Sequence, residues 1–311
     1  MKKRECDTSN KSYIKKFTSN LLSSHHGAKS LQYFIPNDAS HAKTIPSDAS
    51  NVNTIKAIHT SKPIDPKALS ADSKANLVNQ LYHIHCQIFD GVDRDQFCRY
   101  VVDPPTLSTR IRFFRNTNGE NVGYITTQIF ETKVQKDGYV TKPLVYRTEV
   151  GILPEYRGNN IVLRTLLWDC LRGYVRSAKR ESWFLATPIH PNPYCVAAKQ
   201  MYEMYPKPGI DTPQHVKDMM EELSHSLGLE PTGNSTLQRK VGWIVKNRPE
   251  RRCQPEQSTN PFVQYYLQQN PTFREGTGMM MVIPFGWMNI SWSMGNMIWR
   301  SFKNGIQSGQ Q

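Results

Sequence analysis

Residues 146–162 read Tyr-Arg-Thr-Glu-Val-Gly-Ile-Leu-Pro-Glu-Tyr-Arg-Gly-Asn-Asn-Ile-Val, and this stretch decides the fold. Its first half alternates as a strand does, with Val150 and Ile152 on one face and Glu149 on the other. Pro154 ends strand pairing because it has no N–H to donate. A short polar turn follows the proline. The stretch therefore predicts a strand that turns sharply before the chain continues.

The residues after the turn predict a long helix. From Leu163 to Ala178 apolar residues recur at the spacing of one helical face, about 3.6 residues per turn, and the opposite face is basic. A strand that turns into a helix leaves the first N–H groups of the helix unpaired, which favours an anion there. Arg157 adds a charge suited to phosphate. The junction is thus either a phosphate site or a turn with an exposed loop cation.

The chain on both sides of this junction predicts a regular succession of elements. The helix starts and strand patterns are typical of two helices, an antiparallel meander and a second strand–helix pair. We expect helices after Asp72 or Ser73 and after Asp93, strands at 109–116, 122–134 and 143–153, a strand at 182–188 and a helix at 194–205.

Residues 152–162 resemble the pyrophosphate-binding motif of the GNAT superfamily of acyl-CoA N-acyltransferases. The family's pattern is Arg or Gln, two residues, Gly, one residue, then Gly or Ala. Arg157 matches the first position, whereas Asn160 stands where Gly is usual and Val162 where Gly or Ala is usual. Ala198, Met201 and Tyr202 resemble a second motif of the family in their spacing. Cys195 stands where the family has Asn.

The resemblance implies an α+β fold, in which helices cover both faces of a mixed, mostly antiparallel twisted sheet, followed by a C-terminal extension. It implies a GNAT-like domain at 66–303, with a core at 70–205, an insertion at about 207–236 and the last strands and a C-terminal helix at 237–303. Residues 1–65 are polar and basic, and we expect a disordered or loosely docked tail there.

The activity that the resemblance implies is acetyl transfer from acetyl-CoA to an amine through a tetrahedral intermediate. The backbone of the central strand and the turn would bind acetyl-CoA, which assigns that role to Val150, Ile152, Leu153, Arg157, Gly158, Asn159, Asn160, Ile161 and Val162. The acceptor is left open between a small molecule and a protein amine. A catalytically silent GNAT-like binding module is the alternative.

Two side chains are candidates for the proton transfers. Glu149 lies on the central strand, where some family members carry the base; otherwise it is a strand glutamate paired with Arg147 or Arg164. Tyr202 matches the motif tyrosine that can protonate the CoA sulfur in the family, with a core aromatic as the alternative.

The composition indicates which classes of partner the chain could bind. The chain has 39 Lys plus Arg and 26 Asp plus Glu, a formal charge of +13. This charge suggests an anionic partner, but the sequence contains no recognisable nucleic-acid-binding motif. Six cysteines without a Cys-x-x-Cys pair, and no secretory signal, predict a cytoplasmic protein with no metal. Residues 278–299 carry no charge, and 286–302 predicts a helix that packs on the domain, docks a partner or binds a membrane surface.

Overall fold

The computed structural model describes residues 56–157, 161–176, 180–233, 235–246, 255–286, 288–289, 291–292 and 295. The chain divides into two units, and all the described residues belong to the unit Val52–Trp299. Residues 1–55 of the tail expected at 1–65, and the C-terminal residues 296–311, lie outside the described residues.

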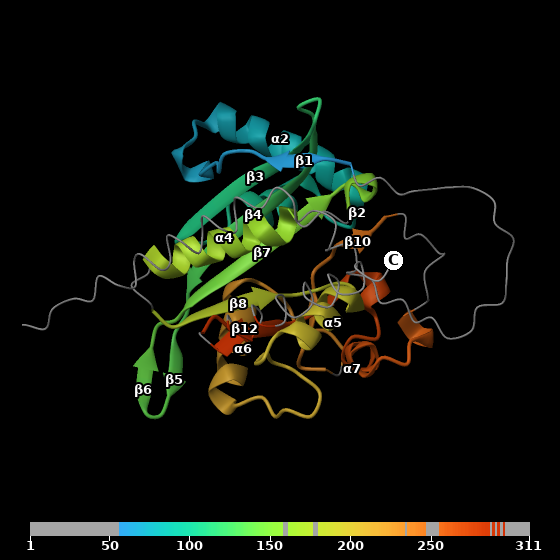
Figure 1. Ribbon diagram of the computed structural model, residues 1–311. Helices are drawn as coiled ribbons and strands as arrows, with labels where there is room; N and C mark the ends of the chain where they lie inside the picture. The colour runs from blue at the N-terminus through green and yellow to red at the C-terminus, as the bar shows by residue number, and fades with distance from the viewer. Residues whose placement is uncertain are drawn as a thin grey trace, which may run out of the picture. The chain divides into compact units, whose positions relative to one another are not determined.

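A six-stranded sheet carries the fold, in the order β1-β3-β4-β7-β8-β12 (Figure 1). All neighbours are antiparallel except β7 and β8, which run parallel. The mixed, mostly antiparallel α+β architecture expected from the sequence is therefore confirmed. The strands are β1 (Ile58–Thr60), β3 (Ser108–Asn116), β4 (Asn121–Glu131), β7 (Leu144–Ile152), β8 (Ser182–Ala186) and β12 (Met281–Pro284).

Helices cover both faces of the sheet. On one face, here called the α2 face, lie α2 (Ala71–Ile88), α3 (Arg94–Phe97), the π-helix η2 (Cys98–Val102) and α6 (Gln214–Ser226). On the other, the α4 face, lie α4 (Ile161–Arg176), α5 (Pro191–Gln200) and α7 (Pro261–Gln269). Figure 1 shows α4 in front of the sheet and α2 behind it.

The helix starts follow local chemistry, with one change from the expected residues. Ser70, rather than Asp72 or Ser73, caps α2, because its side chain accepts a hydrogen bond from the backbone N–H of Ser73. Asp93 caps α3 as expected, in a capping box with Gln96.

Short strands complete the fold. They are β2 (Phe89–Asp90), β5 (Val134–Lys136), β6 (Tyr139–Thr141), β9 (Gln238–Lys240), β10 (Ile244–Val245) and β11 (Thr277–Met279). The last strands, which the resemblance placed at 237–303, lie only partly in the main sheet. β9 pairs with β11 and β10 with β2 outside the main sheet, while β12 joins β8.

Two further differences concern the expected boundaries. β1 lies inside the stretch expected to be a tail, since Ile58 to Thr60 pair with the end of β3. The expected insertion contains α6, whose Val216, Met219 and Leu223 pack against β7, β8 and β12 as part of the core. The insertion therefore belongs to the hydrophobic core of the domain.

Candidate active site

The two parallel strands at the centre of the sheet separate halfway along. β7 pairs with β8 from Leu144, opposite Ser182, to Arg147, opposite Leu185, and no further. On its other side β7 stays paired with β4 as far as Ile152. Among the described residues, the second half of β7 therefore has no strand partner at this edge, and Glu149 is the second residue beyond the last pair.

A buried polar strip crosses the α2 face beside this opening. Gln128 lies opposite Arg147, and Thr126 lies opposite Glu149, so the four side chains share one face. Apolar clusters lie at both ends of the strip, one with Tyr124 under α2 and the other with Val145 under α6. The hydroxyl of Thr126 and the Oε1 of Gln128 are buried without a hydrogen-bonding partner among the described residues. Such atoms are rare in native interiors and suit a bound polar group or water.

Glu149 and Arg147 form an ion pair within the strip. The Arg147 Nη2 lies 2.8 Å from the Glu149 Oε1, and the Glu149 side chain is 17 % exposed against 3 % for Arg147. Burial raises the pKa of Glu149, and the neighbouring Arg147 charge opposes that shift. Glu149 is thus paired with Arg147, as one alternative held, and it lies on the part of β7 that has no β8 partner. A partly exposed carboxyl with a raised pKa has the properties of a general base.

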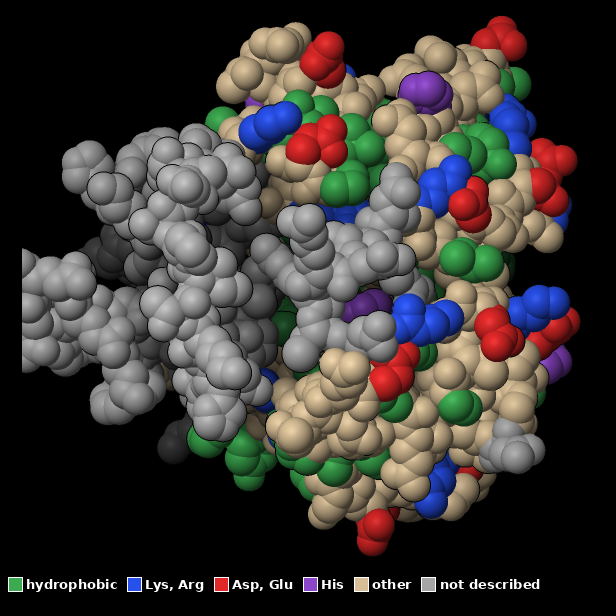
Figure 2. All heavy atoms as spheres, turned by 90° about the vertical axis from the view of Figure 1, so that its right-hand side faces the viewer, with side chains coloured by type: hydrophobic (Ala, Val, Ile, Leu, Met, Phe, Trp, Pro, Cys, Tyr) green, Lys and Arg blue, Asp and Glu red, His purple; other side chains and the backbone are tan. Residues whose placement is uncertain are grey.

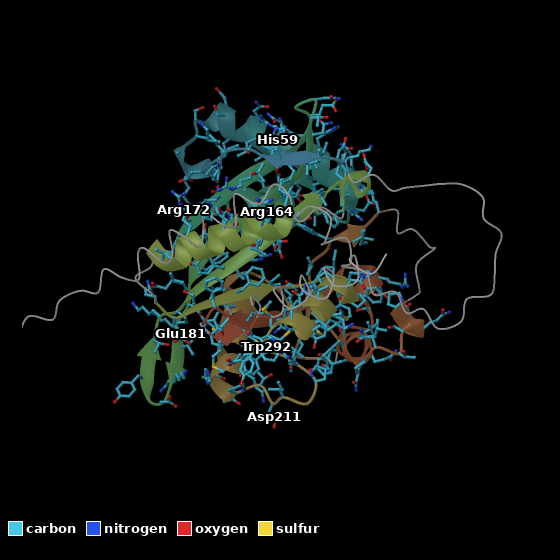
Figure 3. The ribbon with its side chains drawn as sticks, viewed as in Figure 1. His59, Arg164, Arg172, Glu181, Asp211 and Trp292 are labelled. Carbon is cyan, nitrogen blue, oxygen red and sulfur yellow. The ribbon has the colours of Figure 1, made fainter. Side chains whose placement is uncertain are left out.

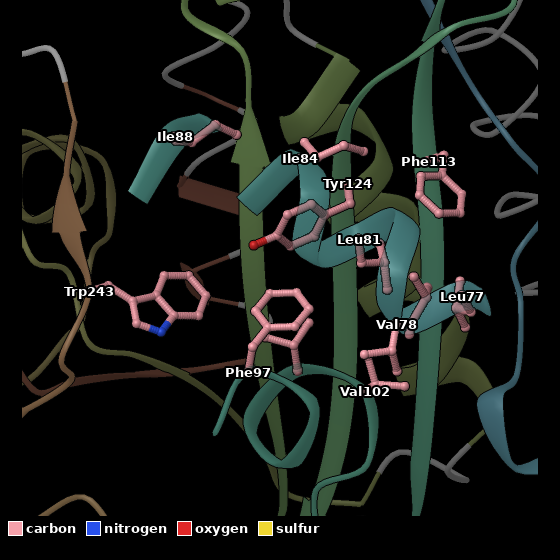
Figure 4. Close-up of a cluster of buried hydrophobic side chains, with 12 residues drawn as sticks. Leu77, Val78, Leu81, Ile84, Ile88, Phe97, Val102, Phe113, Tyr124 and Trp243 are labelled. Carbon is pink, nitrogen blue, oxygen red and sulfur yellow. The ribbon is translucent and has the colours of Figure 1, made fainter. Parts of the chain in front are cut away.

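Aromatic rings pack over the strip and beside it. The Arg147 guanidinium lies 3.8 Å from the ring centre of Tyr100, and the Gln128 amide donates to the carbonyls of Tyr100 and Val101. Trp243, from the segment before β10, lies 5.6 Å from Tyr100. Figure 4 shows the apolar cluster under α2, in which Trp243 faces Phe97 and Tyr124.

The turn after β7 is described as far as Arg157. Leu153 donates its N–H to the carbonyl of Val122, and the 3-10 helix η3 (Pro154–Tyr156) follows. The exposed Arg157 donates from Nε to the carbonyl of Ile152, so the candidate phosphate ligand lies at the end of the unpaired edge. Gly158, Asn159 and Asn160 lie outside the described residues.

The start of α4 packs on the sheet. Ile161 and Val162 contact the cluster of Phe114, Val122 and Ile125, together with Val150 and Ile152 of β7. Val162, which departs from the family's small residue, thus has a packing role. Arg164 and Arg172 lie on the exposed side of α4 (Figure 3), and neither is the partner of Glu149.

Tyr202 lies beyond the helix on which we expected it. α5 ends at Gln200 because Met201 adopts an extended backbone, so the expected helix at 194–205 is too long. The Tyr202 ring is 47 % exposed and lies 5.6 Å from Trp292, and both line a shallow hollow with Met288, Ser291 and Gly295. Tyr202 is therefore not a core aromatic.

The hydroxyls of the neighbouring tyrosines are engaged in hydrogen bonds. Tyr194 donates to the carbonyl of Pro206, and Tyr205 donates to the carboxylate of Glu203. Burial, helped by Glu203, raises the pKa of Tyr205 to about 12. With their hydroxyls hydrogen-bonded in this way, Tyr194 and Tyr205 are poorer proton donors than an exposed tyrosine.

Sequence reasoning missed most of the residues around Glu149. Tyr100, Gln128 and Trp243 come from three separate parts of the chain and meet only in the fold. Arg147 had a signal, because it stands two residues before Glu149 on the same strand and so shares its face.

Other kinds of site find little support in the described part of the chain. It contains no group of three or more His, Cys, Asp or Glu side chains placed to hold a metal ion. None of its helices has the length and hydropathy needed to cross a membrane. On the face seen in Figure 2, described Lys and Arg side chains alternate with Asp and Glu and form no large basic patch.

Comparisons with known proteins concern the fold. No family model and no curated protein matches the sequence. Among solved structures, Arabidopsis thaliana NAA60 in complex with acetyl-CoA matches 48 % of this chain and 89 % of its own, at 16 % identity and a TM-score of 0.33. Chaetomium thermophilum Naa20 in complex with a bisubstrate analogue matches 48 % and 73 %, at 13 % identity and a TM-score of 0.28. Escherichia coli ElaA matches 49 % and 95 %, at 18 % identity and a TM-score of 0.26. Each of these matches covers about half of this chain, at a TM-score below 0.5.

Proposed function

We propose that this protein is an N-acyltransferase that moves an acetyl group from acetyl-CoA to an amine. The observation that carries the proposal is the separation of β7 from β8 directly beside a partly exposed carboxylate, Glu149. An unpaired strand edge offers backbone donors to a bound chain, and the carboxylate can accept a proton there.

The residues present suit acetyl-CoA. The edge of β7 from Val150 to Ile152 would take the pantetheine arm and the thioester through backbone hydrogen bonds. Leu153 would only line that path, because its own N–H and carbonyl already bond to Val122 and Tyr156. Arg157, with Gly158 to Asn160 and the start of α4, would take the pyrophosphate. Val162 packs on the sheet cluster, which is compatible with a phosphate at the turn.

Acyl transfer then needs two proton movements. Glu149 removes a proton from the acceptor amine, whose nitrogen attacks the thioester carbonyl carbon. N–H groups of the β7 edge stabilise the oxyanion of the tetrahedral intermediate. The C–S bond breaks, and Tyr202 donates its hydroxyl proton to the leaving thiolate of CoA.

The acceptor would approach from the α2 face. Glu149 points to that face, whereas the turn and α4 belong to the opposite one. Tyr100 and Trp243 provide aromatic surface close to the carboxylate's partner Arg147. A primary amine on an apolar body, from a small molecule or a protein, suits such a surface.

Binding of acetyl-CoA is the first test. Isothermal titration of the full chain should show saturable binding, and Arg157→Ala should weaken it, since a phosphate contact is lost. Arg180→Ala, which removes an exposed arginine that pairs with Glu131, is the matched control. Absence of binding at millimolar acetyl-CoA would rule out the proposal.

Transfer to a panel of amines is the second test. Glu149→Gln should lower kcat by about 100-fold or more, as loss of a general base does, with little change in acetyl-CoA affinity. Glu131→Gln is the control, because Glu131 is a surface partner of Arg180. Binding without transfer to any amine would instead support the catalytically silent binding module.

The role of Tyr202 is tested separately. Tyr202→Phe should slow turnover while acetyl-CoA affinity stays unchanged. Tyr139→Phe, an exposed tyrosine on the β5–β6 hairpin, is the matched control. An unchanged rate in Tyr202→Phe would remove Tyr202 from the mechanism.

A further inference from the structure

The position of Arg147 relative to Glu149 suggests a role that the proposed function does not include. Arg147 is the last residue of β7 that pairs with β8, opposite Leu185. Glu149 lies two residues further on the same face and has no β8 partner. Arg147 therefore stands on the fixed side of the opening and Glu149 on the open side.

Arg147 is held from several directions. Its guanidinium stacks on the Tyr100 ring at 3.8 Å, and the residue is 2 % exposed. Gln128, its neighbour across β4, binds the carbonyls of Tyr100 at 2.9 Å and Val101 at 3.2 Å. The strand register and the Gln128 hydrogen bonds thus fix both the arginine and the ring beneath it. A planar guanidinium held in this way can fix a carboxylate in one orientation.

Arg147 is also the charge that Glu149 faces. Burial keeps the pKa of Tyr124 well above its ordinary value and lowers that of His85 to about 4, so both are neutral at pH 7. Lys246 and Asp90, near His85, pair with each other at 2.7 Å. Cys86 of α2 and Tyr100 of η2 are further titratable side chains packed on this side.

We propose that Arg147 is a positioning residue for the base: clamped on Tyr100, it holds the Glu149 carboxylate at the opening between β7 and β8 and keeps it ionised. This role rests on the proposed acetyl transfer, in which Glu149 takes the proton. Two effects act on the carboxyl in opposite directions. Burial favours its neutral form, and the arginine 2.8 Å away favours the anion that can accept a proton.

Removal of the arginine should therefore change the titration of Glu149 in a defined direction. Without the opposite charge, burial alone acts on the carboxyl and its pKa rises further. At any given pH the variant would then hold a larger fraction of Glu149 protonated than the wild type does. Its activity would recover as the pH is raised, because the base ionises there.

The experiment combines an NMR titration with kinetics on the full chain. The side-chain carboxyls of ¹³C-labelled glutamates are titrated, and the Glu149 signal is assigned by its loss in Glu149→Gln. In Arg147→Gln we expect the Glu149 pKa and the acid limb of kcat/KM to shift upward together. Arg147→Lys keeps a positive charge, so its shift should be smaller than that of Arg147→Gln. Arg180→Gln should leave the Glu149 pKa and the acid limb of kcat/KM unchanged. An unshifted Glu149 titration in folded Arg147→Gln overturns the proposal.

A second variant covers the case in which Arg147→Gln fails to fold. Tyr100→Leu removes the stacking surface but leaves the arginine, so we expect kcat to fall severalfold while KM for acetyl-CoA stays unchanged. Wild-type kcat in this variant overturns the positioning role. The two proposals fail separately: a shifted titration without acetyl transfer in the wild type contradicts the proposed function alone, and transfer without a shift contradicts the role of Arg147 alone.

Discussion

His85 should make the stability of the protein depend on pH. The ring is 1 % exposed, its Nδ1 lies 3.0 Å from the Tyr124 hydroxyl, and its Nε2 is buried without a partner among the described residues. Trp243 and Phe97 lie 4.6 and 4.7 Å from it. Burial, helped by the charge of Lys246, lowers the pKa from its ordinary 6.5 to about 4. The folded protein therefore holds this histidine neutral at pH 7.

The sign and size follow from the two pKa values. Below pH 6.5 the unfolded chain binds a proton at His85 that the folded chain does not take up until about pH 4. Stability is thus present above 6.5 and is lost as the pH falls towards 4. The full window corresponds to about 3 kcal/mol, of which about 2 kcal/mol should be lost between pH 7 and pH 5.

Denaturant unfolding at pH 7, 6 and 5 provides the assay. His85→Asn keeps an amide near the Tyr124 hydroxyl but does not titrate, so its unfolding free energy should fall by about 2 kcal/mol less than that of the wild type over this range. The change of slope is the readout, whatever the variant loses at pH 7. His83→Asn, at an exposed position of the same helix, is the matched control. Parallel pH dependences for wild type and His85→Asn would refute the reasoning.

Two further predictions concern packing and hydrogen bonding. Gly173→Ala should destabilise the protein by about 1–3 kcal/mol, because the new Cβ would lie 2.6 Å from the Tyr146 ring, whereas Gly295→Ala, with nothing within 4 Å, should not; thermal unfolding separates the two. Asn289→Ala should cost about 1–3 kcal/mol, since Asn289 accepts from the N–H of Glu203 and donates to the carbonyls of Glu203 and Pro284, and exposed Ser291→Ala is its control. Equal melting temperatures within either pair would contradict the corresponding prediction.

The elements that the sequence predicted well are those with local signals. The start of α3 follows from the side chain of Asp93, and β3 and β4 follow from alternation interrupted by a turn. The central strand and the helix after it follow from the period change at Pro154. These features depend on residues a few positions apart, which the chain order shows directly.

The features that the sequence could not predict depend on distant residues. Tyr202 was expected on a helix at 194–205, but Met201 leaves the helix and Tyr202 turns outward to Trp292. Trp243 reaches the ring of His85 only because β10 pairs with β2, and no periodicity near either residue indicates that pairing. The neighbours of Glu149 are fixed by cross-strand register, which a single strand does not reveal.

The position of α4, and with it the candidate phosphate turn, depends on a buried ion pair. Arg112 of β3 donates hydrogen bonds to the Asp169 carboxylate of α4 from Nη2 at 2.9 Å and from Nε at 3.3 Å. The Arg112 side chain is 13 % exposed and the Asp169 side chain 2 %. Arg112 also donates to the carbonyl of Ser61 after β1, so one guanidinium ties the edge strand, the sheet and the helix together. Removal of one partner leaves the other charge buried and unpaired.

Asp169→Asn should therefore lower the unfolding free energy by about 3–5 kcal/mol. Asp103→Asn removes the partner of Lys74, an exposed pair with side chains 28 % and 47 % exposed, and should cost less than about 1 kcal/mol. The double variant Arg112→Met, Asp169→Leu should recover much of the loss, because it leaves no unpaired charge. If the double variant is as unstable as Asp169→Asn, packing rather than charge holds α4 in place. If it is stable and still binds acetyl-CoA like the wild type, the ion pair serves the fold and not the cofactor turn.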